Sequence, residues 1–68
     1  KRIKDEAFAR CSQLTHVNLD NCEGLEEIGK KAFYRCISIR EIVIPPAVKR
    51  IEEGAFERCL ELTTVKFL

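Results

Sequence analysis

The sequence lacks most of the features that mark membrane spans, nucleotide sites and nucleic-acid-binding proteins. No apolar run approaches the roughly 20 residues that a spanning helix needs, and the three glycines are isolated rather than gathered into a phosphate-binding loop. Neither sign of charge dominates, because 12 basic residues stand against 11 acidic ones. A net charge of +1 creates no general field that attracts nucleic acid or an anionic membrane. We therefore expect neither nucleic-acid binding nor direct membrane insertion.

Metal-binding and catalytic patterns are also missing. The four cysteines have no C-x-x-C spacing and His16 is the only histidine, so the usual ligand spacing of a zinc site is absent. A catalytic His16 would need a nucleophile, an orienting carboxylate and oxyanion donors in an enclosed pocket, which so short a chain does not offer. We predict no enzyme activity, metal, cofactor or small-molecule substrate. No signal sequence indicates a compartment, and we expect the chain to be a segment of a longer polypeptide.

What the sequence does contain is an internal repeat. A shared pattern of 18 positions starts at Ile3, Ile28 and Ile51, and connecting residues follow the first two copies. Five columns of the repeat are identical, namely Ile3/Ile28/Ile51, Ala7/Ala32/Ala55, Phe8/Phe33/Phe56, Arg10/Arg35/Arg58 and Cys11/Cys36/Cys59. Three further columns are apolar in every copy, namely Leu14/Ile39/Leu62, Val17/Ile42/Val65 and Leu19/Ile44/Phe67. We divide the chain into repeats over about 3–27, 28–50 and 51–68.

Each repeat predicts one short helix and one short strand. The apolar positions from Ile to Cys follow helical spacing, although Gly29 and Gly54 weaken the start, so a 3₁₀ or distorted turn is an alternative there. Strict alternation predicts strands at 16–19, 41–44 and 64–67. A single unit cannot bury its apolar stripe alone, whereas stacked units can. The fold class is therefore an α/β repeat solenoid of three rungs, with parallel strands on one face and short helices on the other.

The pattern I-x-x-x-A-F-x-x-C-x-x-L-x-x-V-x-L resembles the BspA-like (Treponema pallidum type) family of leucine-rich repeats. The resemblance covers nearly the whole chain, and A-F-x-x-C at 7–11, 32–36 and 55–59 is its most specific part. It implies a fragment of a leucine-rich-repeat horseshoe that is used for binding. The first repeat departs from the pattern, because Asp20-Asn21-Cys22 stands where a proline is expected after the strand.

The cysteine column is interpreted as packing. Cys11, Cys36 and Cys59 close the apolar stripe, and free cysteine behaves in proteins as a small buried hydrophobe. A metal site or a disulfide between neighbouring rungs is the alternative. Cys22 lies outside every column, and we expect a structural position under its loop rather than a reactive thiol.

The arginine column has two interpretations. Arg10, Arg35 and Arg58 each end a predicted helical segment, where a cation can meet the free carbonyls and the negative end of the helix dipole. Alternatively, the three guanidinium groups form a basic patch, centred on the second repeat, that holds phosphate or carboxylate on a partner.

The outward side chains of the three predicted strands are the main candidates for function. They form two rows across the sheet, His16/Glu41/Thr64 and Asn18/Val43/Lys66, and Val43 is the apolar centre of a polar field. We expect this concave strand face to recognise a protein partner. The alternative is a structural subunit or spacer that contacts neighbouring repeats through uncapped apolar ends.

Overall fold

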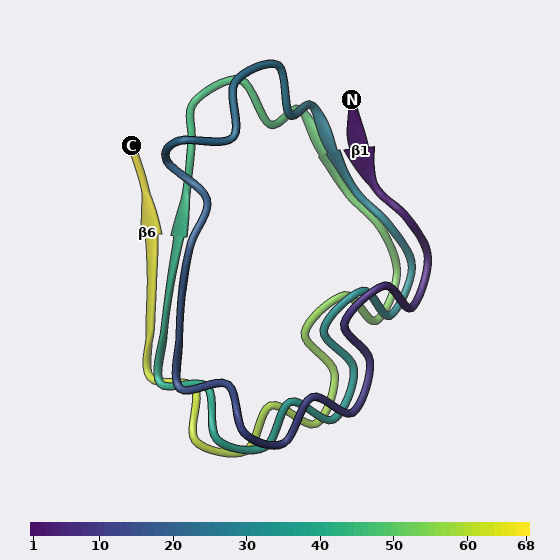
Figure 1. Ribbon diagram of the computed structural model, residues 1–68, viewed down its shortest axis with the longest axis vertical. Coiled ribbons are helices and arrows are strands. Elements are labelled where there is room, and N and C mark those ends of the chain that lie inside the picture. Colours follow the sequence, from purple (N-terminus) through teal and green to yellow (C-terminus); the bar gives the residue numbers. More distant parts are fainter.

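The computed structural model describes residues 1–68 as a coil of three turns, built from six short strands and no helix. The strands are β1 (Arg2–Ile3), β2 (His16–Asn18), β3 (Glu27–Ile28), β4 (Glu41–Ile44), β5 (Arg50–Ile51) and β6 (Thr64–Phe67). They form two parallel sheets, β1-β3-β5 and β2-β4-β6, which lie on opposite sides of the coil (Figure 1). Rungs one, two and three are the turns that contain Ile3, Ile28 and Ile51.

The register of both sheets is the register of the sequence repeat. His16 pairs with Glu41, and Glu41 pairs with Thr64, while the isoleucines at 3, 28 and 51 pair in the other sheet. The predicted strands are therefore confirmed to within one residue. The β1-β3-β5 sheet was not predicted, because its strands of two residues are too short for an alternating pattern to reveal them.

The predicted short helices are wrong: the segments 4–11, 29–36 and 52–59, here called the turn wall, are successive tight turns. Within rung one, the N–H groups of Ala7, Ala9 and Cys11 each donate to the carbonyl three residues earlier. Positive φ angles at Glu6 (58°) and Arg10 (64°) interrupt these turns before a helix can propagate.

Alternate N–H groups of the turn wall in rungs one and two pair with the next rung, which explains why a helix does not form. Glu6, Phe8 and Arg10 donate to carbonyls of rung two, with N···O distances of 2.9, 2.8 and 2.6 Å. Rung two donates to rung three in the same way from positions 31, 33 and 35. Every one of these bonds runs from the earlier rung to the later one. Pairing with a neighbour thus replaces the hydrogen bonds that a helix would make within itself.

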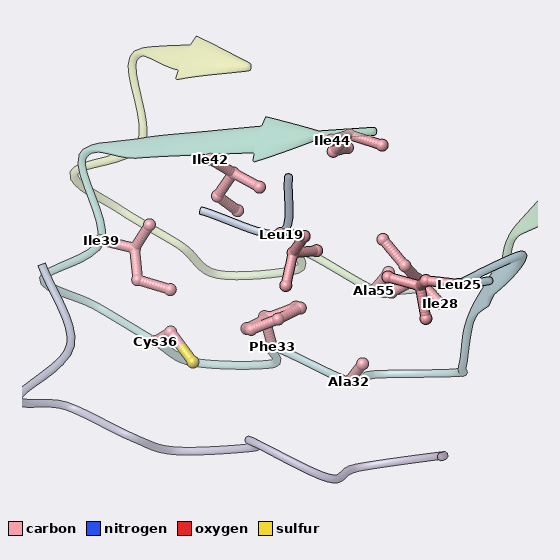
Figure 2. Close-up of a cluster of buried hydrophobic side chains, with 10 residues drawn as sticks. All are labelled: Leu19, Leu25, Ile28, Ala32, Phe33, Cys36, Ile39, Ile42, Ile44 and Ala55. Atoms are coloured by element: carbon pink, nitrogen blue, oxygen red, sulfur yellow. The ribbon is translucent and has the colours of Figure 1, made fainter. Parts of the chain in front are cut away.

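The core is built around rung two (Figure 2). Phe33 is only 1% exposed, and its ring stacks between those of Phe8 and Phe56, at centroid distances of 5.3 and 5.6 Å. Burial of a side chain of this size stabilises a fold by about 1.5–3 kcal/mol. The buried apolar side chains are Leu19, Leu25, Ile28, Ala32, Phe33, Cys36, Ile39, Ile42, Ile44 and Ala55.

Two local features fit the chain into this stack. Gly29 is buried so closely against rung one that a Cβ there would lie 2.7 Å from both the backbone nitrogen of Asp5 and the carbonyl oxygen of Ile3. In the first connection, where the expected proline is missing, the Asn18 side chain accepts a hydrogen bond from the Asp20 N–H at 2.8 Å and turns the chain. Leu25, which is 4% exposed, then anchors the loop in the core.

Candidate partner-binding surface

The strand face, defined by His16, Asn18, Glu41, Val43, Thr64 and Lys66, has the two rows that the sequence predicts. Alternate residues of the same strands point inward, so Ile42 is fully buried while its neighbours Glu41 and Val43 are half-buried. Lys66 Nζ lies 3.7 Å from Glu41 Oε2, which links the two rows diagonally. His16 Nδ1 contacts the Thr15 hydroxyl at 3.1 Å rather than a carboxylate.

The side chains of this face are mostly polar. An amide, an imidazole and a hydroxyl offer hydrogen bonds, and the exposed Glu41–Lys66 pair is weakly held and can exchange for pairs with a partner. Val43 lies between Asn18 and Lys66 in the sheet register and supplies apolar area at the centre. Such a surface combines a small apolar anchor with polar groups around it.

A groove beside the strand face was missed by sequence reasoning. It has a volume of about 440 Å³ and is lined by Thr15, Ile37, Ser38, Arg40, Leu60 and Glu61. It adjoins the face because Thr15 and Arg40 come immediately before β2 and β4. Two of its residues are large and apolar yet exposed, Ile37 by 43% and Leu60 by 75%. The column Ser12/Ile37/Leu60, apolar in two of three repeats and outside the core stripe, was the signal that could have indicated it.

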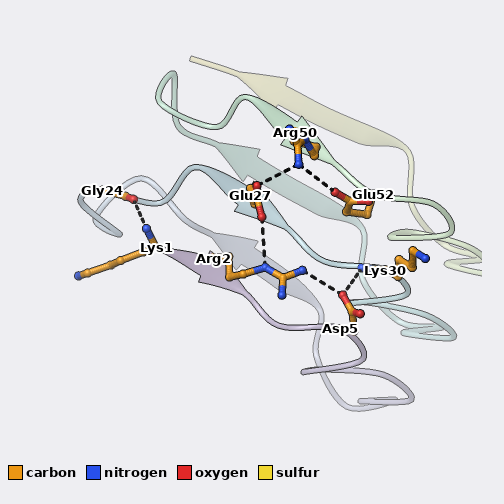
Figure 3. A network of polar contacts seen from close by, with 8 residues as sticks. All are labelled: Lys1, Arg2, Asp5, Gly24, Glu27, Lys30, Arg50 and Glu52. Carbon is orange, nitrogen blue, oxygen red and sulfur yellow. Dashed lines mark hydrogen bonds and ion pairs between the residues drawn. The ribbon is translucent and has the colours of Figure 1, made fainter.

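The opposite sheet carries a line of ion pairs (Figure 3). The Glu27 carboxylate lies between two guanidinium groups, 3.2 Å from Arg2 and 3.2 Å from Arg50. Arg2 also contacts Asp5 at 3.1 Å, and Arg50 lies 3.8 Å from Glu52. The charges of this sheet are therefore matched within the chain, and they leave less unpaired charge for a partner.

The arginine column does not cap helices, because no helix exists for it to cap. The guanidinium carbons of Arg10 and Arg35 instead each lie 5.7 Å from the centroid of the Tyr34 ring. Lys31 Nζ lies 5.1 Å from the same centroid. Arg58 makes no such contact, since Glu57 occupies the tyrosine position in its rung. Two of the three predicted arginines thus come together, joined by a lysine and a tyrosine that the prediction did not include.

The cysteine column packs as predicted, and two of its thiols also donate hydrogen bonds to backbone carbonyls. The Cys36 thiol donates to the Phe8 carbonyl at 3.0 Å, and the Cys59 thiol donates to the Phe33 carbonyl at 3.1 Å. Burial raises the pKa of both thiols, which keeps them protonated and poorly nucleophilic. All four cysteines are free thiols, and no three His, Cys, Asp or Glu side chains gather in a way that could hold a metal ion.

The expectation for Cys22 is wrong, because its side chain is exposed rather than under the loop. Leu25 fills the apolar position below the first connection, so Cys22 is left on the outside. The chain has no helix long and apolar enough to cross a bilayer.

A coil of parallel rungs whose columns of identical residues stack in register defines a repeat solenoid. The family model described as "BspA type Leucine rich repeat region (6 copies)" matches residues 1–68, and the chain belongs to this family. No curated protein and no solved structure matches the chain. Repeat modules of the leucine-rich type commonly bind proteins.

Proposed function

We propose that this chain is a non-enzymatic protein-binding module that recognises a partner protein through its strand face. The observation that carries the proposal is the register of β2, β4 and β6, which gathers outward side chains from three rungs into one continuous surface. No single strand of three or four residues presents all six of these side chains, whereas the stacked strands do.

The groove beside the strand face supports the same proposal. An apolar side chain of a partner that entered between Ile37 and Leu60 would cover surface that water now contacts. The Arg40 side chain at the groove makes no ion pair and is available to a carboxylate of the same partner. Anchoring in a pocket beside a polar rim is how small interfaces become specific.

Affinity capture with matched variants tests this proposal. The chain is immobilised, exposed to an extract of the cells that produce it, and compared with Glu41→Arg/Val43→Asp/Lys66→Glu and with Lys49→Glu, which lies outside the face. We expect a partner that is retained by the wild type and by Lys49→Glu, and whose affinity for the triple variant falls at least about tenfold. Equal retention by all three proteins would contradict recognition through the strand face.

A second candidate function is a structural subunit whose end surfaces contact neighbours. Phe67 and Leu68 are 70% and 58% exposed on rung three, and Phe8 is 41% exposed on rung one. Apolar area of this kind favours association through the ends of the stack. In sedimentation velocity over a range of concentrations, this candidate predicts that Phe67→Glu abolishes self-association while Glu41→Arg leaves it unchanged. The opposite pattern would exclude it.

A further inference from the structure

The cluster around Tyr34 differs from every other charged group of the molecule. Its three cations, Arg10, Lys31 and Arg35, come from two rungs and all lie within the roughly 6 Å reach of a cation–π contact with one ring. The five ion pairs of the structure use Arg2, Arg50 and Lys66 as their cations, so none of the three has a carboxylate partner. The cluster is therefore a local concentration of positive charge in a chain that is nearly neutral.

The backbone conformation at these positions belongs to the repeat. Arg10, Lys31 and Arg35 have φ angles of 64°, 52° and 57°, and Glu6 and Arg58 in the same two columns have φ angles of 58° and 61°. What distinguishes the cluster is therefore its side chains, which are long cations on both sides of the only tyrosine of the chain.

The geometry favours an oxyanion ligand. A guanidinium group that lies over an aromatic ring keeps its N–H donors in its own plane, where they remain free to bind a carboxylate in bidentate fashion. The contact with the ring also restricts the side chain before the ligand arrives, which reduces the entropy lost on binding. Two arginines and a lysine around one ring thus form a preorganised set of donors.

The charges along the stack limit how large the ligand can be. Glu6 in rung one and Glu57 in rung three flank the cluster. The backbone N–H of Glu6 donates to the carbonyl of Lys30, and the backbone N–H of Arg35 donates to the carbonyl of Glu57. A long polyanion that followed the stack would meet these carboxylates. A short acidic segment that crossed rung two would meet the three cations first, although the Glu57 carboxylate lies beside the Lys31 stem, since both side chains approach Gly54.

We propose that Arg10, Lys31 and Arg35, arranged around Tyr34, bind a short acidic segment of a partner protein through its Asp and Glu carboxylates. This site is on the turn wall and does not depend on the strand face, so either proposal can fail without the other. Arg58 belongs to the same sequence column but has no aromatic ring beside it, and it has no part in the site.

Fluorescence anisotropy of a labelled peptide with six Glu and Asp residues tests the site, with the Gln and Asn version of that peptide as the uncharged control. We expect the acidic peptide alone to bind, and its affinity to fall as NaCl rises from about 50 to about 500 mM. Arg10→Gln/Arg35→Gln should weaken binding by more than about tenfold, because two charge-assisted contacts are lost. Arg58→Gln and Arg50→Gln should change it by less than about twofold.

The ring is tested separately. Tyr34→Phe keeps the aromatic face and should retain binding, whereas Tyr34→Leu removes the face and should weaken binding several-fold, and thermal melts of both variants check that the fold is intact. Three results would overturn the proposal: no binding of the acidic peptide by the folded chain, an Arg58→Gln effect as large as that of Arg10→Gln/Arg35→Gln, or equal binding by Tyr34→Leu and Tyr34→Phe. A heparin fragment of equal charge that bound more tightly through the same residues would also overturn it, in favour of a sulfated polymer.

Discussion

Rung two and the rungs on either side of it carry the same A-F-x-x-C motif but have different environments. Phe33 is 1% exposed, whereas Phe8, with the same sequence neighbours Ala and Cys, is 41% exposed. The difference arises from position, because rung two is covered on both faces and rung one on only one. A repeat residue in this fold thus has no fixed energetic weight, and its contribution depends on how many rungs contact it.

The sharpest test of this comparison is truncation of the stacked phenylalanines. Phe33→Ala should lower the free energy of unfolding by about 3–5 kcal/mol, since it leaves a cavity between two rings. Phe8→Ala and Phe56→Ala should each lower it by less, because each ring stacks on one neighbour only. Urea melts of the three variants provide the measurement. A smaller loss for Phe33 than for the other two would contradict the stacked-rung explanation.

Rungs one and two also differ at the column of Gly29 and Lys4, where the backbone of rung two approaches that of rung one. Gly29→Ala should cost about 1–3 kcal/mol, because the new Cβ collides with backbone atoms of Asp5 and Ile3 that cannot move without separating two rungs. The same column in rung one holds Lys4, and Lys4→Ala should change the stability by less than about 0.5 kcal/mol. Thermal unfolding of the two variants checks the difference, and equal losses would show that Gly29 is not a point of close contact.

The thiols offer a finer comparison between rungs. Cys36→Ala removes a buried sulfur and its hydrogen bond to Phe8, so we expect a loss of about 1–2 kcal/mol in chemical denaturation. Cys11→Ala should cost less, since Cys11 is only half-buried and its thiol donates to no carbonyl. A larger loss for Cys11 would mean that the thiol-to-carbonyl contact contributes little.

The same thiols should make stability fall at alkaline pH. Because burial raises the pKa of Cys36 and Cys59, the unfolded chain loses its thiol protons first, near the ordinary value of about 8.5. Their contribution is therefore complete below that pH and decreases as the pH rises from there through the folded values. Urea midpoints measured between about pH 8 and about pH 10 should fall more steeply for the wild type than for Cys36→Ala/Cys59→Ala. The same pH dependence of the urea midpoint in both proteins would contradict the raised pKa of Cys36 and Cys59.

The smallest loss of stability is expected from substitutions of the ion pairs beside the β1-β3-β5 sheet. Glu27→Gln removes the carboxylate between Arg2 and Arg50 and should cost no more than about 1 kcal/mol, because all three side chains are partly exposed. Glu52→Gln, with one contact at 3.8 Å, should cost less. Both losses should disappear at about 1 M NaCl in urea melts, where the Debye length is about 3 Å. A loss that persisted at high salt would point to packing rather than charge.

Much of the fold could be predicted from sequence because the repeat columns fix the register. Stacking Ile3 on Ile28 and Phe8 on Phe33 gives the parallel arrangement and the core without further information. The helices could not be excluded in the same way, since the spacing of apolar side chains is shared by a helix and by a chain of tight turns. The choice is made by backbone N–H groups that pair between rungs, and side-chain patterns do not record it.

The candidate surfaces were predictable to different degrees. The rows of the strand face follow from alternation and from the repeat, which together place His16, Glu41 and Thr64 side by side. The Tyr34 cluster required knowledge of how a side chain of rung two lies against Arg10 of rung one. Only the column of arginines was visible in the sequence, and the column does not reveal that Arg10 and Arg35 contact the ring whereas Arg58 does not.

The six hydrogen bonds that start at 6, 8, 10, 31, 33 and 35 all run toward the later rung, and they give this part of the turn wall an electrical direction. In the β2-β4-β6 sheet the bonds run both ways, as from Arg40 to Thr15 and from Leu19 to Val43, so their dipoles largely cancel. In the turn wall the peptide dipoles add along the stacking axis, as they do in a helix. Unpaired N–H groups at 54, 56 and 58 therefore make rung three the positive end, and free carbonyls at 5, 7 and 9 make rung one the negative end. Two donor ends or two acceptor ends cannot form hydrogen bonds with each other along this wall. A further rung that pairs with the wall must therefore run parallel to the existing rungs.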